Sequence, residues 1–424
     1  ILYHQQNEDF VFDNHNILVT LYTKILTLPS LQADNQHFFL QILDNLLYLF
    51  MSQTRISVDC SVFLPRVMSD LIGKGLIFTP TDDFLVAVFQ ETLFPSQEFP
   101  EEKKKLNYAL RMNELMQFVI DRYSECIPYQ KIIDSFCEKA KTTNKCPFIR
   151  TLRKLIENPN VTLEMTLGIY DVLPRIFDDN DRLQIDFLQL AWTLIQKGVD
   201  FARVFSDTID LSRLFDELFA KSHQEEPQLW SLFLEICIFY LDSPSIFPNF
   251  FQMINHQRLF EHMCYLLDHN EDFLHLAEYI RQYCLLYQKL LTNYKEIIEQ
   301  FNTSLIDLFF RISPLNFKIK AESVKVLCLA LCGGNTELIQ YLLSHGIIEI
   351  IIDSLEVATD TPLLLHTIQT IIRYAQNFED TRPMELIYQE DNIQIFRNLI
   401  DNSTDDDSIA LLTDILDQNP FKED

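Results

Sequence analysis

Metal ligation is the first chemistry that the residue types suggest, because four histidines and a cysteine lie close together. They are His256, His262, Cys264, His269 and His275. Zinc ligands on a helix need a spacing of three or four residues to share one face, and zinc turns use a Cys-x-x-Cys pair. Neither spacing occurs here, and His262 and Cys264, two residues apart, point to different sides of a helix. We therefore expect surface or core histidines, with no metal and no cofactor.

Acidic and hydroxyl side chains near the carboxyl end mimic the start of a calcium-binding loop: Asp401, Ser403, Asp405 and Asp407. Such a loop needs glycine at its sixth position and glutamate at its twelfth. The sequence has Asp406 and Leu412 there. It therefore predicts a solvated acidic loop rather than a calcium site.

Motifs for nucleophilic catalysis are absent from the sequence. It contains no G-x-S-x-G, no H-E-x-x-H and no H-x-E paired with P-C-x-x-C. Only 7 of its 424 residues are glycine, and phosphate-binding loops need glycine where the backbone approaches the phosphate. We expect that the protein is not an enzyme.

One basic segment opposes the overall charge. Six cations lie in it with no acid between them, and the last three share one face of a predicted helix. We expect this segment either to bind an acidic partner segment or a phosphate, or to be a solvated loop and helix start. The six residues are Lys139, Lys141, Lys145, Arg150, Arg153 and Lys154.

The charge balance limits the classes of partner. The formal net charge is −27, from 34 Lys and Arg against 61 Asp and Glu. Such a molecule repels nucleic acid and anionic lipid overall, so we expect a protein or peptide partner that is basic or neutral. The simpler interpretation is that the acidity keeps a Phe-rich chain soluble.

The cysteines and the apolar runs limit the compartment. Nine cysteines at irregular spacings, several inside apolar runs, are typical of reduced thiols in the cytoplasm, with the nucleus as an alternative. No uncharged apolar run reaches the roughly 18 residues that a spanning helix needs, so we expect no membrane insertion. Because the first residue is Ile1, we expect the sequence to be part of a longer chain.

Apolar residues recur at i, i+3, i+4 and i+7 through most of the chain, as in the segment 38–50. This is the period of a helix and not of a strand. The apolar faces are wide, which indicates helices that are buried on two sides. Prolines and polar clusters divide the pattern into helices of about 10–18 residues.

The second half of the chain contains an internal repeat of about 45 residues. Five segments share a polar start followed by an apolar helix, and their aligned apolar positions lie 45, 46, 42 and 45 residues apart. A period in the forties is the length of an armadillo or HEAT repeat. The aligned positions are Phe215, Phe260, Ile306, Ile348 and Ile393.

The segment 320–355 is the most specific unit. A helix ends at Gly333-Gly334, Asn335 follows, and Gly346 precedes the next apolar helix. This segment resembles the armadillo-repeat consensus. We expect Gly334 to adopt the left-handed conformation of a helix C-cap, and Gly346 to permit a sharp start of the next helix.

The resemblance implies an all-α, right-handed α-solenoid of armadillo/HEAT-like repeats. We expect one repeat domain over 1–424, with roughly nine units. The repeats are clearest over 211–400 and indistinct over 1–200. In armadillo proteins the third helix of each unit lines a groove, and matching positions give candidate partner-binding residues: Asp307, Arg311, Glu349, Asp353, Arg397 and His262.

These expectations combine into a functional hypothesis. We expect a non-catalytic scaffold or adaptor that binds a basic or extended protein partner along an acidic concave groove. One alternative is an importin-like nuclear transport receptor. That family pairs Trp with Asn four residues later, and neither Trp192 nor Trp230 is followed by such an Asn. Another alternative is a regulatory subunit of a signalling or cytoskeletal assembly.

Overall fold

The protein is described by a computed structural model that covers residues 20, 24, 46–50, 58–73, 80–93, 101–141, 149–178, 185–219, 227–269, 276–355 and 361–421. Within these residues the chain forms helices and turns and no strand. Two compact units are present. Unit 1 comprises residues 1–181 and 189–209, and unit 2 comprises residues 182–188 and 210–424.

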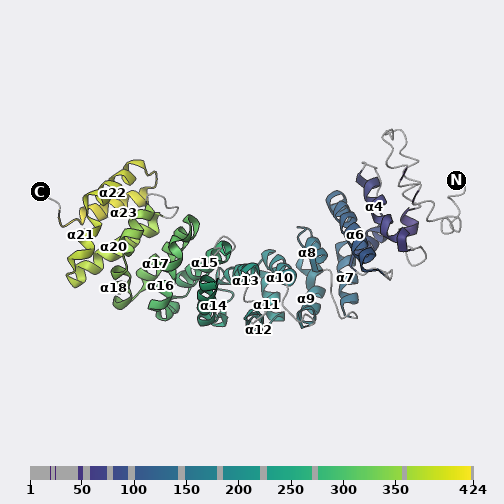
Figure 1. The fold of residues 1–424 in the computed structure, drawn as a ribbon, viewed down its shortest axis with the longest axis horizontal. Coiled ribbons are helices and arrows are strands. Elements are labelled where there is room, and N and C mark those ends of the chain that lie inside the picture. Colours follow the sequence, from purple (N-terminus) through teal and green to yellow (C-terminus); the bar gives the residue numbers. More distant parts are fainter. Residues whose placement is uncertain are drawn as a thin grey trace. The chain divides into compact units, whose positions relative to one another are not determined.

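Unit 1 consists of helices that pack on near neighbours in the sequence (Figure 1). Helices α4 and α5 pack on α6, α5 also packs on α7, and α9 packs on both α7 and α11. The short 3₁₀ helix η4 (Ser124–Cys126) follows α6. The helices are α4 (Val58–Gly73), α5 (Asp82–Leu93), α6 (Glu102–Tyr123), α7 (Tyr129–Ala140), α8 (Ile149–Ile156), α9 (Leu163–Asp178), α10 (Ile185–Gln196, which belongs to this unit from residue 189) and α11 (Val199–Thr208).

Unit 2 is built from two layers of helices, which lie along its two sides in Figure 1. Layer A consists of five helices, each of which packs on the next. It comprises α13 (Pro227–Leu241), α15 (Ala277–Asn293), α17 (Phe317–Gly333), α20 (Thr361–Phe378) and α23 (Asp406–Asp417). Layer B comprises α12 (Leu211–Leu218), α14 (His256–His269), α16 (Thr303–Ile312), α18 (Thr336–Ser344), α19 (Ile347–Leu355) and α21 (Thr381–Ile387).

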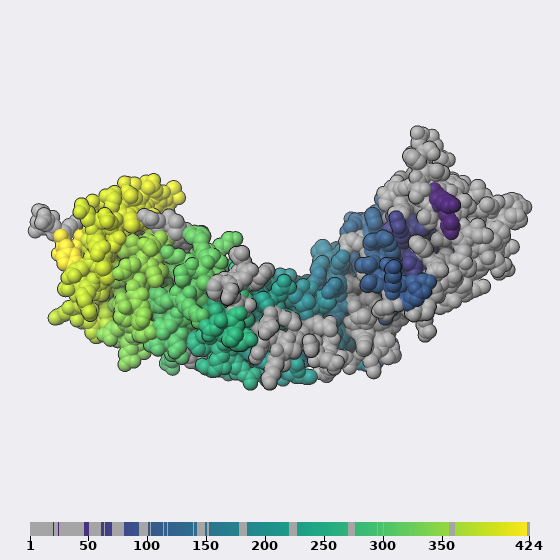
Figure 2. Space-filling model, in the orientation of Figure 1, coloured from purple at the N-terminus to yellow at the C-terminus, as the bar shows by residue number. Residues whose placement is uncertain are grey.

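The remaining elements of unit 2 connect or end the layers. Helix α22 (Glu390–Asn402) packs on α23. Three 3₁₀ helices join the α-helices: η5 (Phe250–Met253), η6 (Lys295–Gln300) and η7 (Ser313–Leu315). Figure 2 shows the side chains of the stacked helices as successive bands, from teal at α12–α14 through green to yellow at α22–α23.

The repeat expected from the sequence is present as structure. The five predicted repeat segments form α12, α14, α16, α19 and α22. The prediction of a helical repeat is thus confirmed for 211–402. The handedness, the number of units and the single repeat domain stay predictions.

The core between the two layers of unit 2 is rich in aromatic side chains. Trp230, Tyr279, Tyr283 and Tyr287 are almost completely buried. Tyr283 and Tyr287 both lie against Phe309, with ring centroids 5.9 and 5.5 Å apart. The apolar faces of these helices are wide, so each helix packs against neighbours in its own layer and in the other layer. Contact with a single layer would leave about half of each apolar face in water.

Asparagine side chains begin three consecutive helices of unit 2. Asn302, Asn316 and Asn335 accept hydrogen bonds from the backbone N–H groups three residues later, at 3.0, 2.9 and 2.9 Å. Each cap satisfies a donor that the helix itself cannot satisfy, and such a cap contributes about 1 kcal/mol. The recurrence of the cap fixes where α16, α17 and α18 start.

The two expected glycine roles have different outcomes. Gly346 has φ +75°, so it adopts the left-handed conformation that lets α19 leave α18 sharply. The prediction for Gly334 is wrong, because its backbone is extended with φ −75° and ψ 161°. Glycine is needed there for space instead, since a Cβ would lie 2.7 Å from both the Ala330 carbonyl oxygen and Leu338 Cδ2.

Candidate protein-interaction surface

One stripe of side chains on each of α13, α15 and α17 points away from the core of unit 2. On α13 every residue of this stripe is partly buried, whereas Gln257, Arg258 and Glu261 on α14 of layer B are exposed. Partial burial arises because side chains of adjacent layer A helices shield one another. The outward stripes of α13, α15 and α17 together form a surface that we call the layer A face. Its residues are Leu232, Glu235, Phe239, Glu278, Arg281, Leu285, Gln288, Glu322, Lys325 and Leu329.

Glutamine side chains link the three helices of the layer A face. The Gln282 amide donates to Glu235 Oε1 at 3.1 Å and to Glu278 Oε1 at 2.8 Å, which joins α13 to α15. The Gln288 amide donates to the carbonyl oxygen and to Oε2 of Glu322, at 2.9 and 2.8 Å, which joins α15 to α17. The carboxylates are therefore held in place by neighbouring helices.

Arg281 on α15 is the cation that these glutamates share. Its guanidinium donates to both carboxylate oxygens of Glu278, at 3.1 and 2.7 Å. This bond lowers the pKa of Glu278, and the charges of Glu322 and Glu235 also act on Arg281. Burial, followed by repulsion from Glu278, raises the pKa of Glu235. A further cation near Glu235 would therefore be stabilised, because it would relieve that repulsion.

The layer A face was not among the sequence predictions, although the sequence carries a signal for it. Glu235, Glu278 and Glu322 lie 43 and 44 residues apart, which is the repeat period. A very acidic chain contains many glutamates at such spacings by chance. The spacing therefore identifies a surface only once the structure shows that three adjacent helices bring these carboxylates together. Hydrophobic neighbours such as Leu232 and Leu285 lie in the same stripes.

The predicted partner-binding residues lie elsewhere in unit 2. Asp307 and Arg311 on α16, and Glu349 and Asp353 on α19, belong to layer B, and Arg397 belongs to α22. All five are exposed, so they were correctly expected to point outward. Their role in binding stays a prediction.

Three of these residues contact neighbouring helices of the protein itself. Arg311 pairs with Asp268 of α14 at 2.7 Å. Asp307 accepts a hydrogen bond of 2.7 Å from the Tyr341 hydroxyl on α18. Asp353 lies 3.9 Å from the Lys320 ammonium. These contacts join helices along and across the layers.

His262 does not fit its predicted role in partner binding. Its side chain is 5% exposed, and Nδ1 lies 2.9 Å from the hydroxyl of Tyr279. Its ring also packs on Trp230 with centroids 4.1 Å apart. The residue faces the core because α14 turns this side toward layer A, so His262 is a hydrogen-bonded core histidine.

The residues of the basic segment lie in different parts of the structure, and some lie outside the described residues. Lys145 and the side chain of Lys139 lie outside the described residues. Lys141 pairs with Glu138 at 3.3 Å, and Arg153 pairs with Glu157 at 3.2 Å and donates to the side chain of Gln189. Arg150 and Lys154 lie on the same helix as Arg153, α8. Binding of an acidic partner by this segment stays a prediction.

Among the described residues no group of three or more His, Cys, Asp or Glu side chains could hold a metal ion. Asp405 caps α23 by accepting from the Ser408 N–H at 3.2 Å. No single described helix is long and apolar enough to span a membrane, although α18 and α19, bent by 73°, pass that test of length and composition as a pair.

The described cysteines differ in burial, and Cys126 and Cys332 are exposed. Cys237, Cys284 and Cys328 are buried free thiols in layer A. Burial raises the pKa of Cys237 and Cys284, which keeps both thiols protonated and unreactive. They fill space in the core as small apolar side chains.

Comparisons with known proteins show the fold alone. No protein-family model matches the chain, and no curated protein has significant sequence similarity to it. The chain is similar to the crystal structure of an engineered protein, with a TM-score of 0.56 and 11% identity, over 98% of this chain and 97% of that chain. A second engineered protein has a TM-score of 0.32 at 12% identity, over 68% and 95% of the chains. A circular tandem repeat protein with a novel repeat topology has a TM-score of 0.22 at 12% identity, over 98% and 96%. The last two scores support no argument, and the stacked helices together with the first similarity show a helical-repeat, α-solenoid fold.

Proposed function

We propose that this chain is a non-catalytic scaffold that binds a protein partner on the layer A face. The observation that carries the proposal is the row of Glu235, Glu278 and Glu322 on three adjacent helices, with Arg281 as their shared cation. Three carboxylates stand against two cations, Arg281 and Lys325, and the Lys325 ammonium lies 3.8 Å from Glu322. One negative charge remains in surplus on a surface that also presents Leu232 and Leu285. Mixed surfaces of this kind suit a partner with both basic and apolar side chains.

The partner that suits this surface is a basic, extended segment. Neighbouring helices pack about 8–10 Å apart, and an extended chain advances about 3.3 Å per residue. About every third side chain of such a segment would therefore meet the next glutamate. Charge favours the same partner, since residues 326–424 alone carry 18 Asp and Glu but only four Lys and Arg.

The finer architecture is part of the same proposal. We infer armadillo/HEAT-type repeats in a right-handed superhelix of roughly nine units. The repeat period in the forties, the Gly333–Gly346 segment and the grouping of α17 with α18 and α19 support this inference. A scaffold of this kind would act in the cytoplasm, with the nucleus as an alternative, and it would need no cofactor.

Two pairs of charge reversals would test which layer binds. The first pair, Glu278→Lys with Glu322→Lys, changes the layer A face. The second, Glu261→Lys with Glu349→Lys, changes exposed acids of layer B by the same charge and includes one of the sequence-predicted residues. Proteins captured from the source cell by wild type and by each double variant would be quantified by mass spectrometry at about 50 and about 200 mM salt. Circular dichroism would confirm that both variants fold.

We expect the first pair to lose a defined set of partners while the second retains it. Loss with the second pair alone would assign binding to layer B and contradict the proposal. Equal losses with both pairs would show non-specific attraction to charge, which also contradicts it. A captured set that consists of basic nuclear proteins would favour a transport receptor over a scaffold.

A further inference from the structure

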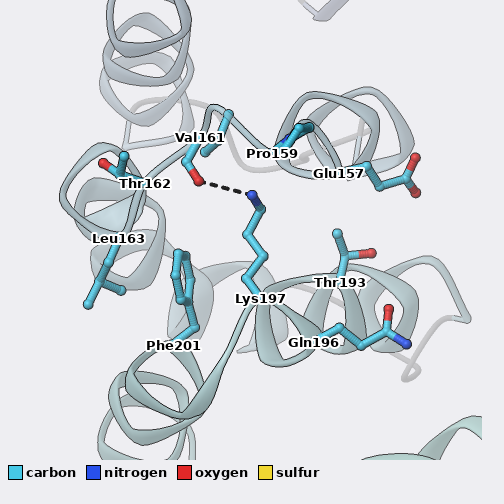
Figure 3. Close-up of a pocket in the computed structure, with 9 residues that line it drawn as sticks. All are labelled: Glu157, Pro159, Val161, Thr162, Leu163, Thr193, Gln196, Lys197 and Phe201. Atoms are coloured by element: carbon cyan, nitrogen blue, oxygen red, sulfur yellow. Dashed lines mark hydrogen bonds between the residues drawn. The ribbon is translucent and has the colours of Figure 1, made fainter.

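Lys197, in unit 1, places a cation in a pocket. The pocket has a volume of about 610 Å³. It lies between the α8–α9 turn on one side and the α10–α11 turn on the other (Figure 3). Its walls are Pro159, Val161, Thr162, Leu163, Thr193, Gln196 and Phe201, and Glu157 completes the lining.

Lys197 lies in the two-residue connection between α10 and α11. It follows the last residue of α10, and Gly198 is the N-cap of α11, with φ +141° in a conformation that other residues rarely adopt. The ammonium group donates to the carbonyl oxygens of Asn158 and Val161, at 2.8 and 2.9 Å. These carbonyls belong to one turn, since the Val161 N–H donates to the Asn158 carbonyl at 3.1 Å. Lysine thus fastens the α8–α9 turn to α10.

These two bonds leave the cation incompletely satisfied. An ammonium group has three N–H donors, so one remains. No described carboxylate lies within 4.0 Å of Nζ. Glu157 is in the lining, but it pairs with Arg153 at 3.2 Å. Burial lowers the pKa of Lys197, and no negative charge opposes this effect. A partly desolvated cation therefore lies in this pocket with no described carboxylate beside it, although the chain has a net charge of −27.

The walls around this cation suit an apolar group. The Phe201 ring lies with its centroid 5.9 Å from Nζ, and Leu163, Val161 and Pro159 extend the apolar wall. The Thr193 hydroxyl donates to the Gln189 carbonyl at 2.8 Å, which leaves its oxygen as an acceptor only. Lys197 is therefore the side chain of this pocket that can bind an anion by charge.

We propose that this pocket binds a monocarboxylate with an apolar tail, whose carboxylate accepts the remaining N–H of Lys197 while its tail lies against Phe201 and Leu163. A dianion would meet the carboxylate of Glu157 as well as the ammonium, so a single negative charge fits best. The ligand could be a free organic acid or the carboxyl terminus of a protein, because both present the same group. The proposal concerns unit 1 and does not depend on the layer A face.

Direct titration of the full chain would test the proposal. The probes are 3-phenylpropionate, its neutral amide, N-acetylphenylalanine and N-acetylphenylalanine amide, with binding measured by isothermal titration calorimetry and ligand-observed NMR. We expect both acids to bind and both amides to bind at least about ten-fold more weakly. Tighter binding of N-acetylphenylalanine would indicate a protein carboxyl terminus, and tighter binding of 3-phenylpropionate would indicate a free acid.

Matched variants would test whether ligand binding depends on the Lys197 ammonium. Lys197→Met removes the ammonium, whereas Lys141→Met removes an equal charge from an exposed site that pairs with Glu138. We expect only Lys197→Met to weaken binding of the acids, by at least about ten-fold. Equal binding of acids and amides, full binding by Lys197→Met, or no binding of any probe would each overturn the proposal.

If Lys197→Met does not fold, proton uptake by the wild type on ligand binding provides a second test of the proposal. An anion that contacts the ammonium raises its pKa, so binding at alkaline pH should take up protons. Titrations in two buffers with different ionisation enthalpies measure this uptake. Binding of the acids without proton uptake at any alkaline pH would show that the carboxylate does not contact Lys197, and would also overturn the proposal.

Discussion

The guanidinium of Arg311 on α16 lies 2.7 Å from the carboxylate of Asp268 on α14. A similar pair joins the preceding helices, because Arg258 on α14 lies 2.9 Å from Asp216 on α12. Successive helices of layer B are thus joined by ion pairs at the surface. Arg311 was predicted from the sequence to contact a partner, and the structure shows that it contacts the preceding repeat.

We expect Arg311→Gln to lower the free energy of unfolding by less than about 1 kcal/mol, because both partners are about half exposed and water screens their attraction. The effect should become smaller as salt is raised. Urea titration of wild type and variant at low and high salt would measure it. A loss of several kcal/mol, or one that salt does not change, would show that this pair is not an ordinary surface ion pair.

Substitutions in the aromatic core of unit 2 should lower the free energy of unfolding far more than the loss of a surface ion pair does. Trp230 is completely buried and packs on Phe219 with ring centroids 4.6 Å apart. We expect Trp230→Ala to cost about 3–5 kcal/mol, because it leaves a cavity between the layers. Gln257→Ala on the exposed side of α14 is the control, with a change within about 0.5 kcal/mol. Thermal melts followed by circular dichroism compare the two, and equal changes would mean that the layers do not share this core.

Gly333 and Gly334 provide a matched pair of substitutions. A Cβ at Gly334 would lie 2.7 Å from a backbone oxygen, whereas at Gly333 the nearest atom, Ile298 Cδ1, is 3.7 Å away. We expect Gly334→Ala to destabilise unit 2 by about 1–3 kcal/mol, as overpacking does. Gly333→Ala should be neutral or slightly stabilising, since it lies at the end of α17. Urea midpoints of the two variants check this, and the reverse order would contradict the described turn.

Because His256 is buried, we expect the protein to lose stability as the pH falls. Its ring nitrogens are buried and have no hydrogen-bond partner among the described residues. Burial lowers its pKa from 6.5 to about 4, with a small opposing effect from the backbone of Phe251. Above pH 6.5 the imidazole is neutral in both states and has no effect. Between pH 6.5 and 4 only the unfolded chain takes up the proton, so stability falls by up to about 1.4 kcal/mol per pH unit.

The experiment for His256 compares His256→Phe with wild type across this pH range. We expect the variant to lose less stability than wild type between pH 7 and 4.5, because the titrating group is gone while the ring remains. His269→Gln, at an exposed histidine, controls for the removal of any imidazole. The explanation fails if both variants follow the pH dependence of wild type.

The positions of helices could be predicted from the sequence, and their ends only in part. The helical period and the repeat spacing located α12, α14, α16, α19 and α22, since burial of a wide apolar face requires a helix at each place. A left-handed residue at the end of a helix was expected at Gly334, but the structure has such residues at Gly346, after α18, and at Glu379, after α20, with φ 75° and 52°. Glu379 lies between the end of α20 and Asp380, whose carboxylate caps α21 by accepting a hydrogen bond from the Arg382 N–H. The helical period does not reveal such a tight connection.

The candidate surface could not be predicted from the sequence alone. The helical period separates inward from outward positions, and the outward assignment of Asp307 and Glu349 was correct. It cannot assign a polar residue on a wide apolar face, so His262 was expected outside and lies in the core beside Tyr279. A histidine can be buried at low cost when a neighbouring hydroxyl satisfies it, and only the packed structure supplies that hydroxyl.

The sequence by itself determined the helical class, the repeat period and the acidity of this protein, because these depend on composition and on the spacing of residues along the chain. The tertiary structure decided which residues of different repeats meet. Glu235, Glu278 and Glu322 become one row only because α13, α15 and α17 pack side by side. Lys197 reaches the Asn158 and Val161 carbonyls only because two turns, far apart in the sequence, are brought together. Electrostatic and hydrogen-bond energies depend on distances of a few ångströms, and those distances are set by packing.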